Sequence, residues 1–244
     1  MKYSYDLHIH SCLSPCGSDE SLPSNIVGMA ALKGLDIIAV CDHNSCGNSE
    51  TVRRLGEAYG VLTIPGMELT TAEEVHVLCL FPDIAHAEEF STYVHSKLLP
   101  IENNEAAFGK QQFVDEDDNI IKTEPLLLIN ATDIAFDSVH DLVKNHRGIM
   151  IPAHIDKSST SILSNMGFIP PDSKFNCAEI RHTGFIDKLK TENNYLERCN
   201  LITDSDAHYL EDISEPINFL ELSEKSVECV LETINNNAAK IYIT

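Results

Sequence analysis

Short apolar segments alternate with segments of helical periodicity along the 244 residues of this chain, and this alternation limits the folds it can adopt. Residues 35–41 are apolar at nearly every position, which is typical of a strand buried on both faces of a sheet. Such strands separated by helices indicate a parallel α/β architecture, either open or closed into a barrel. The expected strands are residues 3–9, 35–41, 61–65, 74–81, 148–153, 176–181 and 200–203, and the expected helices are residues 23–33, 50–59, 85–99, 138–145 and 227–235.

Residues 109–130 depart from this alternation. Two short apolar segments, residues 111–114 and 120–122, flank the acidic stretch 115–119, and this pattern predicts an inserted β-hairpin. The hairpin could be a flap over a site or an ordinary surface hairpin. Because no internal repeat or low-complexity linker interrupts the chain, we expect a single domain over residues 1–244.

The composition is strongly acidic, with 38 Asp and Glu against 17 Lys and Arg and a formal net charge of −21. Because phosphate contacts need cationic side chains, this balance predicts that long nucleic acid is not a partner. No run of 18 apolar residues and no secretory signal is present, so we expect no membrane association. The eight scattered cysteines are typical of reduced thiols, and they favour a cytoplasmic location. The oligomeric state is not indicated.

Six of the eleven histidines lie in or just after predicted strands. Because loops that leave the carboxyl ends of parallel strands converge on one face, we expect these side chains to share a site. A single histidine beside a strand is usually structural, but six at one sheet edge, together with two carboxylates, favour metal binding. The set is larger than one tetrahedral ion can use, so it predicts a cluster of two or three ions. Its members are His8, His10, His43, Glu68, His76, His154, Asp206 and His208.

These residues lie in motifs that resemble those of the polymerase and histidinol phosphatase (PHP) family. The motifs are Asp6-Leu7-His8-Ile9-His10, Asp42-His43-Asn44, Gly66-Met67-Glu68, Val75-His76-Val77-Leu78, Pro152-Ala153-His154 and Ser205-Asp206-Ala207-His208. They occur in the family's order and span essentially the whole chain. The resemblance implies a distorted, TIM-like (β/α)7 barrel, a trinuclear metal centre and the hydrolysis of phosphoesters.

The resemblance also implies a set of metal ligands. One ion would be bound by His8, His10, Glu68 and Asp206, a second by His43, His208 and one further residue, and a third by Glu68, His76 and His154. The family usually places Asp or His five or six residues after the second histidine of the first motif, where this chain has Pro15 and Cys16. We therefore expect Cys16 as the further ligand; Asp19, or no ligand from this loop, are the alternatives. A thiolate would favour Zn or Fe(II).

The expected activity is hydrolysis of a small phosphorylated substrate, of the histidinol phosphate or nucleotide type, by a hydroxide that bridges two of the divalent ions (Zn, Fe or Mn). Asp206 and His208 are candidates for proton transfer, and Asp42 is expected to accept a ring N–H from a ligand. Arg181 and His182 are the candidate phosphate ligands, with Lys157 a weaker one. Two alternatives stay open: a metal-dependent hydrolase of C–N bonds, and a non-catalytic metal-binding module.

Overall fold

The computed structural model describes residues 1–236 and 240–244. The strands are β1 (Lys2–Ile9), β2 (Ile37–Val40), β3 (Leu62–Thr70), β4 (His76–Leu80), β5 (Gln112–Val114), β6 (Ile120–Thr123), β7 (Ile149–Pro152), β8 (Cys177–Glu179), β9 (Asn200–Ile202), β10 (Phe219–Glu221) and β11 (Ile241–Tyr242). The α-helices are α1 (Pro23–Lys33), α2 (Ser49–Tyr59), α3 (Ile84–His95), α4 (Glu105–Phe108), α5 (Phe136–Asn145), α6 (Ile162–Asn165), α7 (Ile186–Glu192) and α8 (Val227–Asn235). Short 3₁₀ turns cover Thr183–Phe185, Asn194–Arg198 and Leu210–Asp212.

Helices α1 and α8 have the bounds that the sequence predicts, because local signals mark their ends. Pro23 lies in the first turn of α1, and Gly34 ends the helix in the left-handed conformation, with φ of 83°. The Ser226 hydroxyl accepts a hydrogen bond from Cys229 N at the start of α8. The predicted helix 85–99 instead ends at His95, and the short strands β10 and β11 were not predicted.

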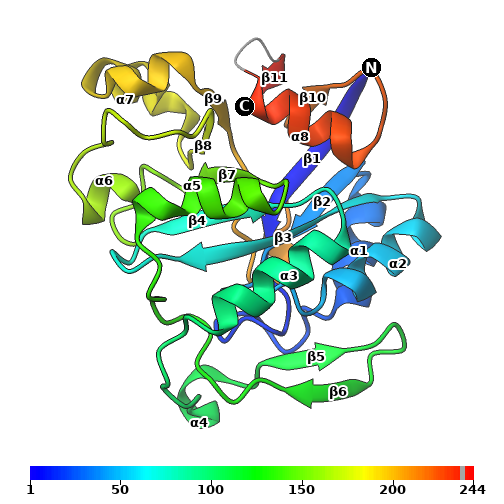
Figure 1. Ribbon diagram of the computed structural model, residues 1–244. Coiled ribbons are helices and arrows are strands. Elements are labelled where there is room, and N and C mark those ends of the chain that lie inside the picture. Colours follow the sequence, from blue (N-terminus) through cyan, green and yellow to red (C-terminus); the bar gives the residue numbers. More distant parts are fainter. Residues whose placement is uncertain (237–239) are drawn as a thin grey trace.

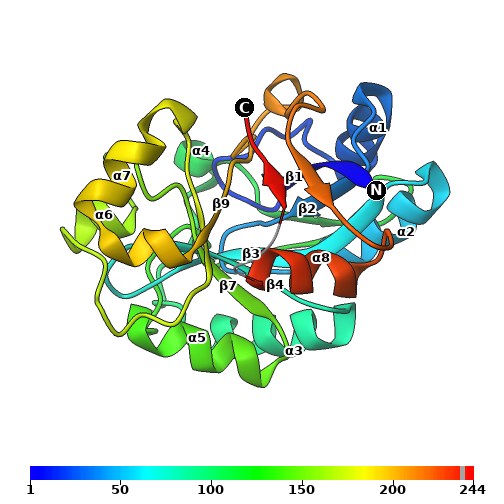
Figure 2. The ribbon, with the colours of Figure 1, turned by 90° about the horizontal axis from the view of Figure 1, so that it is seen from above.

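The main sheet contains seven strands in the order β11-β10-β1-β2-β3-β4-β7, and it curls around a buried interior (Figure 1 and Figure 2). Strands β1, β2 and β3 are parallel, as predicted. Strand β4 runs antiparallel to both β3 and β7. The sequence predicted a mostly parallel sheet, and this prediction is wrong for β4, because β3 and β4 are joined by a tight turn with no helix between them.

The ring expected for a (β/α)7 barrel is only partly formed. Strands β8 and β9 pair with each other in a separate parallel sheet. Single backbone bonds, such as Ile155 N to Glu179 O at 2.9 Å and His10 N to Ala207 O at 2.8 Å, link this pair to β7 and β1. The observed architecture is therefore a mixed α/β fold with a curled half-barrel sheet, closed by isolated bonds near the carboxyl ends of its parallel strands.

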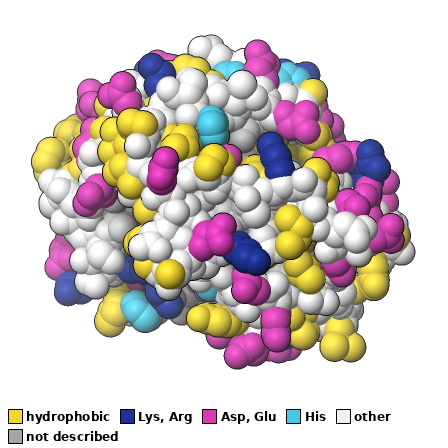
Figure 3. Space-filling view, turned by 90° about the horizontal axis from the view of Figure 1, so that it is seen from below, with side chains coloured by type: hydrophobic (Ala, Val, Ile, Leu, Met, Phe, Trp, Pro, Cys, Tyr) yellow, Lys and Arg dark blue, Asp and Glu magenta, His cyan; other side chains and the backbone are white. Residues whose placement is uncertain are grey.

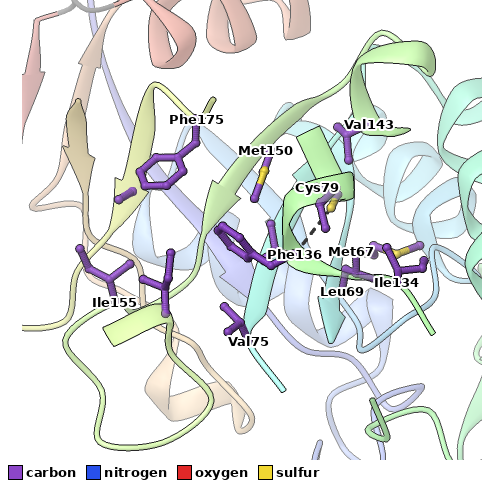
Figure 4. Close-up of a cluster of buried hydrophobic side chains, with 14 of the residues drawn as sticks. Met67, Leu69, Val75, Cys79, Ile134, Phe136, Val143, Met150, Ile155 and Phe175 are labelled. Carbon is purple, nitrogen blue, oxygen red and sulfur yellow. Dashed lines mark hydrogen bonds between the residues drawn. The ribbon is translucent and has the colours of Figure 1, made fainter. Parts of the chain in front are cut away.

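Apolar layers pack against both faces of the curled sheet. The inner layer includes Leu7, Ile64, Leu78 and Ile151, and α8 covers it with Val230 and Ile234. In the outer layer, Phe136 and Val143 of α5 lie over Cys79 and Met150 of the sheet (Figure 4). Full burial of side chains of this size stabilises the fold by about 1.5–3 kcal/mol each. The two layers hold the strands in register, so that residues at the strand ends have fixed positions.

The predicted hairpin forms β5 and β6, which lie beyond the carboxyl ends of β1, β2 and β3 (Figure 1). It is attached to the main body by hydrogen bonds from Gln112 N to Cys12 O at 3.0 Å and from Thr51 Oγ1 to Val114 O at 2.9 Å. A role as a flap stays a prediction. In the described part of the chain, all eight cysteines are free, and no helix is long and apolar enough to cross a membrane.

Two glycines provide a matched test of the packing. A Cβ at Gly148 would lie 2.7 Å from the Leu80 backbone oxygen, whereas a Cβ at Gly28, inside α1, would meet nothing within 4 Å. We expect Gly148→Ala to lower the free energy of unfolding by about 1–3 kcal/mol because the strands must move apart. Gly28→Ala should raise it by about 0.5–1 kcal/mol, since alanine loses less backbone entropy in a helix. Urea denaturation of both variants measures the difference, and equal effects would contradict the close approach of β7 to β4.

Candidate metal centre

The Glu68 carboxylate, at the buried carboxyl-terminal part of β3, lies at the centre of the histidine cluster. It is 1% exposed, and five imidazole nitrogens lie within 3.5 Å of its two oxygens. They are His76 Nδ1 at 2.8 Å, His43 Nδ1 at 3.0 Å, His154 Nε2 at 3.1 Å, His8 Nε2 at 3.3 Å and His10 Nε2 at 3.5 Å. The structure thus brings together five histidines that lie in or next to four different strands.

An irregularity in β1 directs two of these histidines inward. The β1–β2 register shifts between Asp6 and Ile9, which is the signature of a bulge or similar irregularity. Leu7 packs into the inner apolar layer, and His8, next along the strand, nevertheless faces the cluster together with His10. Regular alternation would have sent His8 to the face opposite Leu7.

The reversal at β4 brings a further ligand candidate to the same edge. His76 is the first residue of β4 and lies opposite Thr70, so it is close to the carboxyl end of β3. His154 and Asp206 follow β7 and β9 in left-handed backbone conformations, with φ of 31° and 54°. Such conformations are uncommon outside glycine and are found preferentially at functional sites, where the surrounding contacts hold them in place.

The donor atoms form three sets in which all atoms lie within 4.8 Å of one another. The sets are His10, Cys16, His43 and His208; His8, His10, Glu68 and Asp206; and His43, Glu68 and His76. Within the second set, His8 Nε2 lies 3.1 Å from His10 Nε2 and 3.5 Å from Asp206 Oδ1. Ligands about 2.1 Å from a common ion are about 3.0–3.4 Å apart in octahedral or tetrahedral geometry, so these spacings fit a bound metal. His154 belongs to none of the three sets.

Two buried imidazole nitrogens have no hydrogen-bond partner among the described residues, namely Nδ1 of His43 and Nδ1 of His154. His43 Nδ1 is 3.0 Å from Glu68 Oε2, but the angles do not suit a hydrogen bond. Burial holds the pKa of His43 well below 6.5, so its ring is neutral at pH 7. A neutral buried imidazole whose lone pair lacks a proton donor is a good metal ligand.

The electrostatics around Glu68 favour its charged form. Burial opposes ionisation, but the charges of His76 and His8 outweigh it and hold the pKa of Glu68 well below its usual range. Burial likewise disfavours protonation of His8, yet the charges of Glu179, Glu68 and Asp206 raise its pKa well above 6.5. Without metal, imidazoles of the site therefore carry protons, and bound metal ions would displace these protons.

Cys16 is the expected third ligand of the second ion, and Asp19 is the alternative from the same loop. Cys16 shares a set with His10, His43 and His208, whereas the Asp19 carboxylate accepts a hydrogen bond from Gln112 of the hairpin at 3.3 Å. The geometry thus favours Cys16 over Asp19. Burial, with the nearby Glu68 charge, raises the pKa of the Cys16 thiol to about 12, so metal binding there would release a proton.

Asp42 is linked to the cluster indirectly, which corrects the expectation that it would accept a ring N–H. The Ser14 hydroxyl lies between the two groups, 2.9 Å from His10 Nδ1 and 2.7 Å from Asp42 Oδ1, to which it donates. Asp42 also accepts from the Ser11 hydroxyl at 2.6 Å. The hydrogen bonds from His10 through Ser14 to Asp42 orient the His10 ring so that Nε2 points toward Glu68 and Asp206.

Glu179, at the end of β8, is a site residue that the sequence analysis missed. Its carboxylate oxygens lie 3.0 and 3.1 Å from His8 Nδ1, and one also accepts from His154 N at 2.8 Å. It is buried and fixes the tautomer of His8, with Nε2 free to bind a metal. The available signal was an acidic residue inside a short apolar segment predicted to be a strand.

The predicted phosphate ligands lie outside this cluster. Arg181 and His182 are exposed, and their backbone N–H groups donate to Asp156 at 2.7 and 2.9 Å. Within residues 1–236 and 240–244, Lys157 is the one Lys or Arg that pairs with a cluster residue, at 3.1 Å from Asp206 Oδ2. Lys157, the weaker candidate from the sequence, therefore has the better-placed side chain.

Curated relatives match only part of this chain, and no family model matches it. Over 88 residues it is 34% identical to the uncharacterized protein MJ1587 of Methanocaldococcus jannaschii, a match that covers 32% of this chain and 52% of that protein. Over 103 residues it is 29% identical to a 5'-3' exoribonuclease of Haemophilus influenzae, covering 41% of this chain and 36% of that protein. The chain thus spans about half or less of the length of these relatives.

Solved structures share the fold at low sequence identity. The lesion-specific endonuclease PfuEndoQ of Pyrococcus furiosus superposes with a TM-score of 0.71 at 19% identity, covering 99% of this chain and 58% of that chain. A candidate metal-dependent phosphoesterase of Bifidobacterium adolescentis gives 0.59 at 17% identity, covering 84% and 87%. An amidohydrolase of Chromobacterium violaceum with bound sulfate gives 0.57 at 16% identity, covering 86% and 89%. The fold is one that metal-dependent hydrolases use.

A further structure overturns the expectation that long nucleic acid is excluded. Endonuclease Q in complex with a 27-mer duplex that has an abasic lesion at the active site gives a TM-score of 0.69 at 18% identity, covering 100% of this chain and 58% of that chain. The same fold can therefore take a duplex substrate. The expectation relied on the net charge of the chain, which averages over the whole surface. The charges are in fact mixed locally: on the face in Figure 3, single Lys and Arg side chains lie among many Asp and Glu.

Replacement of Glu179 tests its role in orienting His8. Glu179→Gln keeps the size of the side chain, but both Glu179 oxygens lie within 3.1 Å of His8 Nδ1, so either orientation of the amide places an NH2 group against that ring nitrogen. We expect metal affinity to fall by about 10–100-fold. Competition titration against a chromophoric chelator measures this, with the exposed Glu224→Gln as control. Unchanged affinity in a folded Glu179→Gln protein would contradict the role.

Two half-buried thiols form a matched pair for testing the Cys16 site. We expect Cys16→Ala to reduce the metal content by about one ion per chain, because one set loses its thiolate. Cys229→Ala should leave the content unchanged, since the Cys229 thiol contacts Ser223 at the surface. Elemental analysis of proteins purified in parallel decides the question, and equal metal content in the two variants would remove Cys16 from the ligands.

Proposed function

We propose that this chain is a metal-dependent phosphoesterase whose reaction takes place at the Glu68 cluster. The observation that carries the proposal is the overlap of the three donor sets, because each pair of sets shares one residue: His10, Glu68 or His43. Ions bound in overlapping sets would be immediate neighbours. Adjacent divalent ions are typical of enzymes that transfer phosphoryl groups, because two charges can stabilise the attacking and the leaving oxygen together.

Two or three divalent ions, of Zn, Fe or Mn, fit the donors present. His8, His10, Glu68 and Asp206 would hold one, and His10 or His43 with Cys16 and His208 would hold a second. Glu68 with His76 and either His43 or His154 would hold a third. When bound, such ions supply Lewis acidity and lower the pKa of coordinated water. The mixture of nitrogen, oxygen and thiol donors suits Zn or Fe(II) at the Cys16 set.

The chain's own groups then orient the phosphoester. The Lys157 ammonium, 3.1 Å from Asp206 Oδ2 and 29% exposed, can donate to a phosphoryl oxygen at the cluster. Burial disfavours the charged form of Asp206, yet His8 and a hydrogen bond with His10 hold its pKa below the usual range. Burial lowers the pKa of His208 to about 4. Both groups are therefore deprotonated at pH 7, which favours metal binding over donation of a proton to the leaving group.

The substrate is proposed as a phosphate ester of a small molecule or of a nucleic acid. Net hydrolysis adds water across the P–O bond and gives an alcohol and a phosphate. The duplex bound to Endonuclease Q makes a nucleic-acid phosphodiester one substrate to test. The fold shared with an amidohydrolase keeps C–N hydrolysis as the second candidate.

A substrate panel on metal-analysed protein distinguishes these functions. The panel contains a phosphomonoester, a phosphodiester, single-stranded and abasic duplex oligonucleotides, and a cyclic amide. Turnover of phosphate esters that stops on chelation and returns with added metal supports the proposal. Turnover of the amide alone would favour the second candidate. Full metal loading with no turnover on any substrate would indicate a binding module.

Glu68→Gln tests whether the shared carboxylate carries the activity. Because Glu68 belongs to two of the three donor sets, the change should reduce both metal content and phosphoesterase activity, the latter by about 10³-fold. The exposed Glu224→Gln should retain wild-type values for both. Steady-state rates and elemental analysis are measured on the same preparations. An active Glu68→Gln protein with full metal content would refute the proposed centre.

A further inference from the structure

A groove opens beside the metal centre, between the loop after β7 and the helices α6 and α7. Its volume is about 400 Å³. The two helices lie on the same side of the curled sheet (Figure 1 and Figure 2). Apolar side chains of Ile155, Leu163 and Leu189 line part of it, and Phe185 and Lys157 are also among its lining residues. We call this cavity the Phe185 groove.

Lys157 connects the groove to the cluster. It lines the groove, and its Nζ lies 3.1 Å from Asp206 Oδ2, while its backbone N donates to His154 O at 2.8 Å. The groove and the metal centre therefore share this side chain as a common wall. A phosphoryl group bound at the cluster would have its ester substituent within reach of the groove.

The groove presents an exposed aromatic ring. Phe185 is 54% exposed and is the last residue of the 3₁₀ turn Thr183–Phe185, in which Phe185 N donates to His182 O at 2.9 Å. The two Asp156 hydrogen bonds hold the backbone of Arg181 and His182, and the His182 ring packs edge-on against Phe185 at 5.7 Å. An exposed aromatic ring has only two side-chain torsions to order, so it can stack on a planar ligand with little loss of side-chain entropy.

One cation of the groove lies on the cluster side, and together with the aromatic ring it suits a ligand that has both a phosphate and a planar ring. Lys157 supplies this cation. The second lysine, Lys188, lies 3.9 Å from Glu192, and the other lining carboxylate, Asp156, accepts the backbone hydrogen bonds of Arg181 and His182. Aromatic stacking with cations along a phosphate backbone is how proteins bind nucleotides without reading sequence. A sugar phosphate without a base would leave the Phe185 ring uncovered.

We propose that the Phe185 groove binds the nucleobase of a nucleoside phosphate whose phosphate lies at the metal centre, with Phe185 as the stacking platform and Lys157 on the phosphate. The inference rests on the proposed function and specifies its substrate class. The nucleoside phosphate can be a free nucleotide or the terminal nucleotide of a strand. Arg181 and His182, expected from the sequence to bind phosphate, act here through their backbone by positioning Phe185.

The kinetic test compares two substrates that differ only in the base, adenosine 5'-phosphate and ribose 5-phosphate. Phe185→Ala should raise KM for the nucleotide by about tenfold, because one stacking contact is lost, and should leave ribose 5-phosphate within twofold. Phe185→Tyr should retain the wild-type KM. The matched control is Phe168→Ala, since Phe168 is 56% exposed and lines a different cavity. Equal changes for both substrates, or the same effect from Phe168→Ala, would overturn the inference.

A binding measurement decides the question independently of turnover. The chain contains no tryptophan, so the fluorescence of 2-aminopurine riboside 5'-phosphate can be followed directly. Stacking should quench the probe with wild-type protein but not with Phe185→Ala, and absence of quenching with wild type would refute the groove. A tetranucleotide with terminal 2-aminopurine that binds more tightly than the mononucleotide indicates a strand as the source, and equal affinity indicates a free nucleotide. Quenching without turnover of any phosphoester would refute the proposed function while supporting the groove.

Discussion

The buried carboxylate of Glu68 is the interaction on which the site depends. An ionised carboxylate inside a protein is strongly unfavourable unless opposite charges surround it. Here the surrounding groups are five imidazoles, each within 3.5 Å of a carboxylate oxygen. Neutral imidazoles such as that of His43 do not balance the charge, so protons or metal ions must do so. Divalent ions satisfy the carboxylate and the unpartnered imidazole nitrogens together, which explains why so many donors converge on one residue.

The curled sheet brings these donors together by two departures from regular α/β construction. An irregularity in β1 turns His8 to the same side as Leu7, and the β3–β4 turn returns the chain to the edge it has just left. A strictly alternating (β/α) unit would place the start of the next strand at the opposite end of the sheet, far from Glu68. The partial closure of the barrel and the composition of the site are therefore two results of the same chain path.

The residues that hydrogen-bond to the metal-ligand candidates fix the orientation of their rings. Glu179 holds His8, and Ser14 links His10 to Asp42, so two ring nitrogens are committed to hydrogen bonds and the opposite nitrogens face the centre. Lys157 and Phe185 extend the site on one side with a cation and an aromatic ring. The net charge of −21 does not describe this region, since bound ions would make it locally positive within an acidic molecule.

The sequence by itself determined most of the elements and the residue types of the centre. Local signals such as Pro23, Gly34 and the Ser226 cap mark helix ends, and apolar segments mark the seven expected strands, because both depend on neighbouring residues. It did not determine the direction of β4, the link from Asp42 through Ser14 to His10, or the role of Glu179. Those depend on contacts between distant positions, up to 171 residues apart for His8 and Glu179. Only the packing of the curled sheet brings such positions together, so only the tertiary structure decided them.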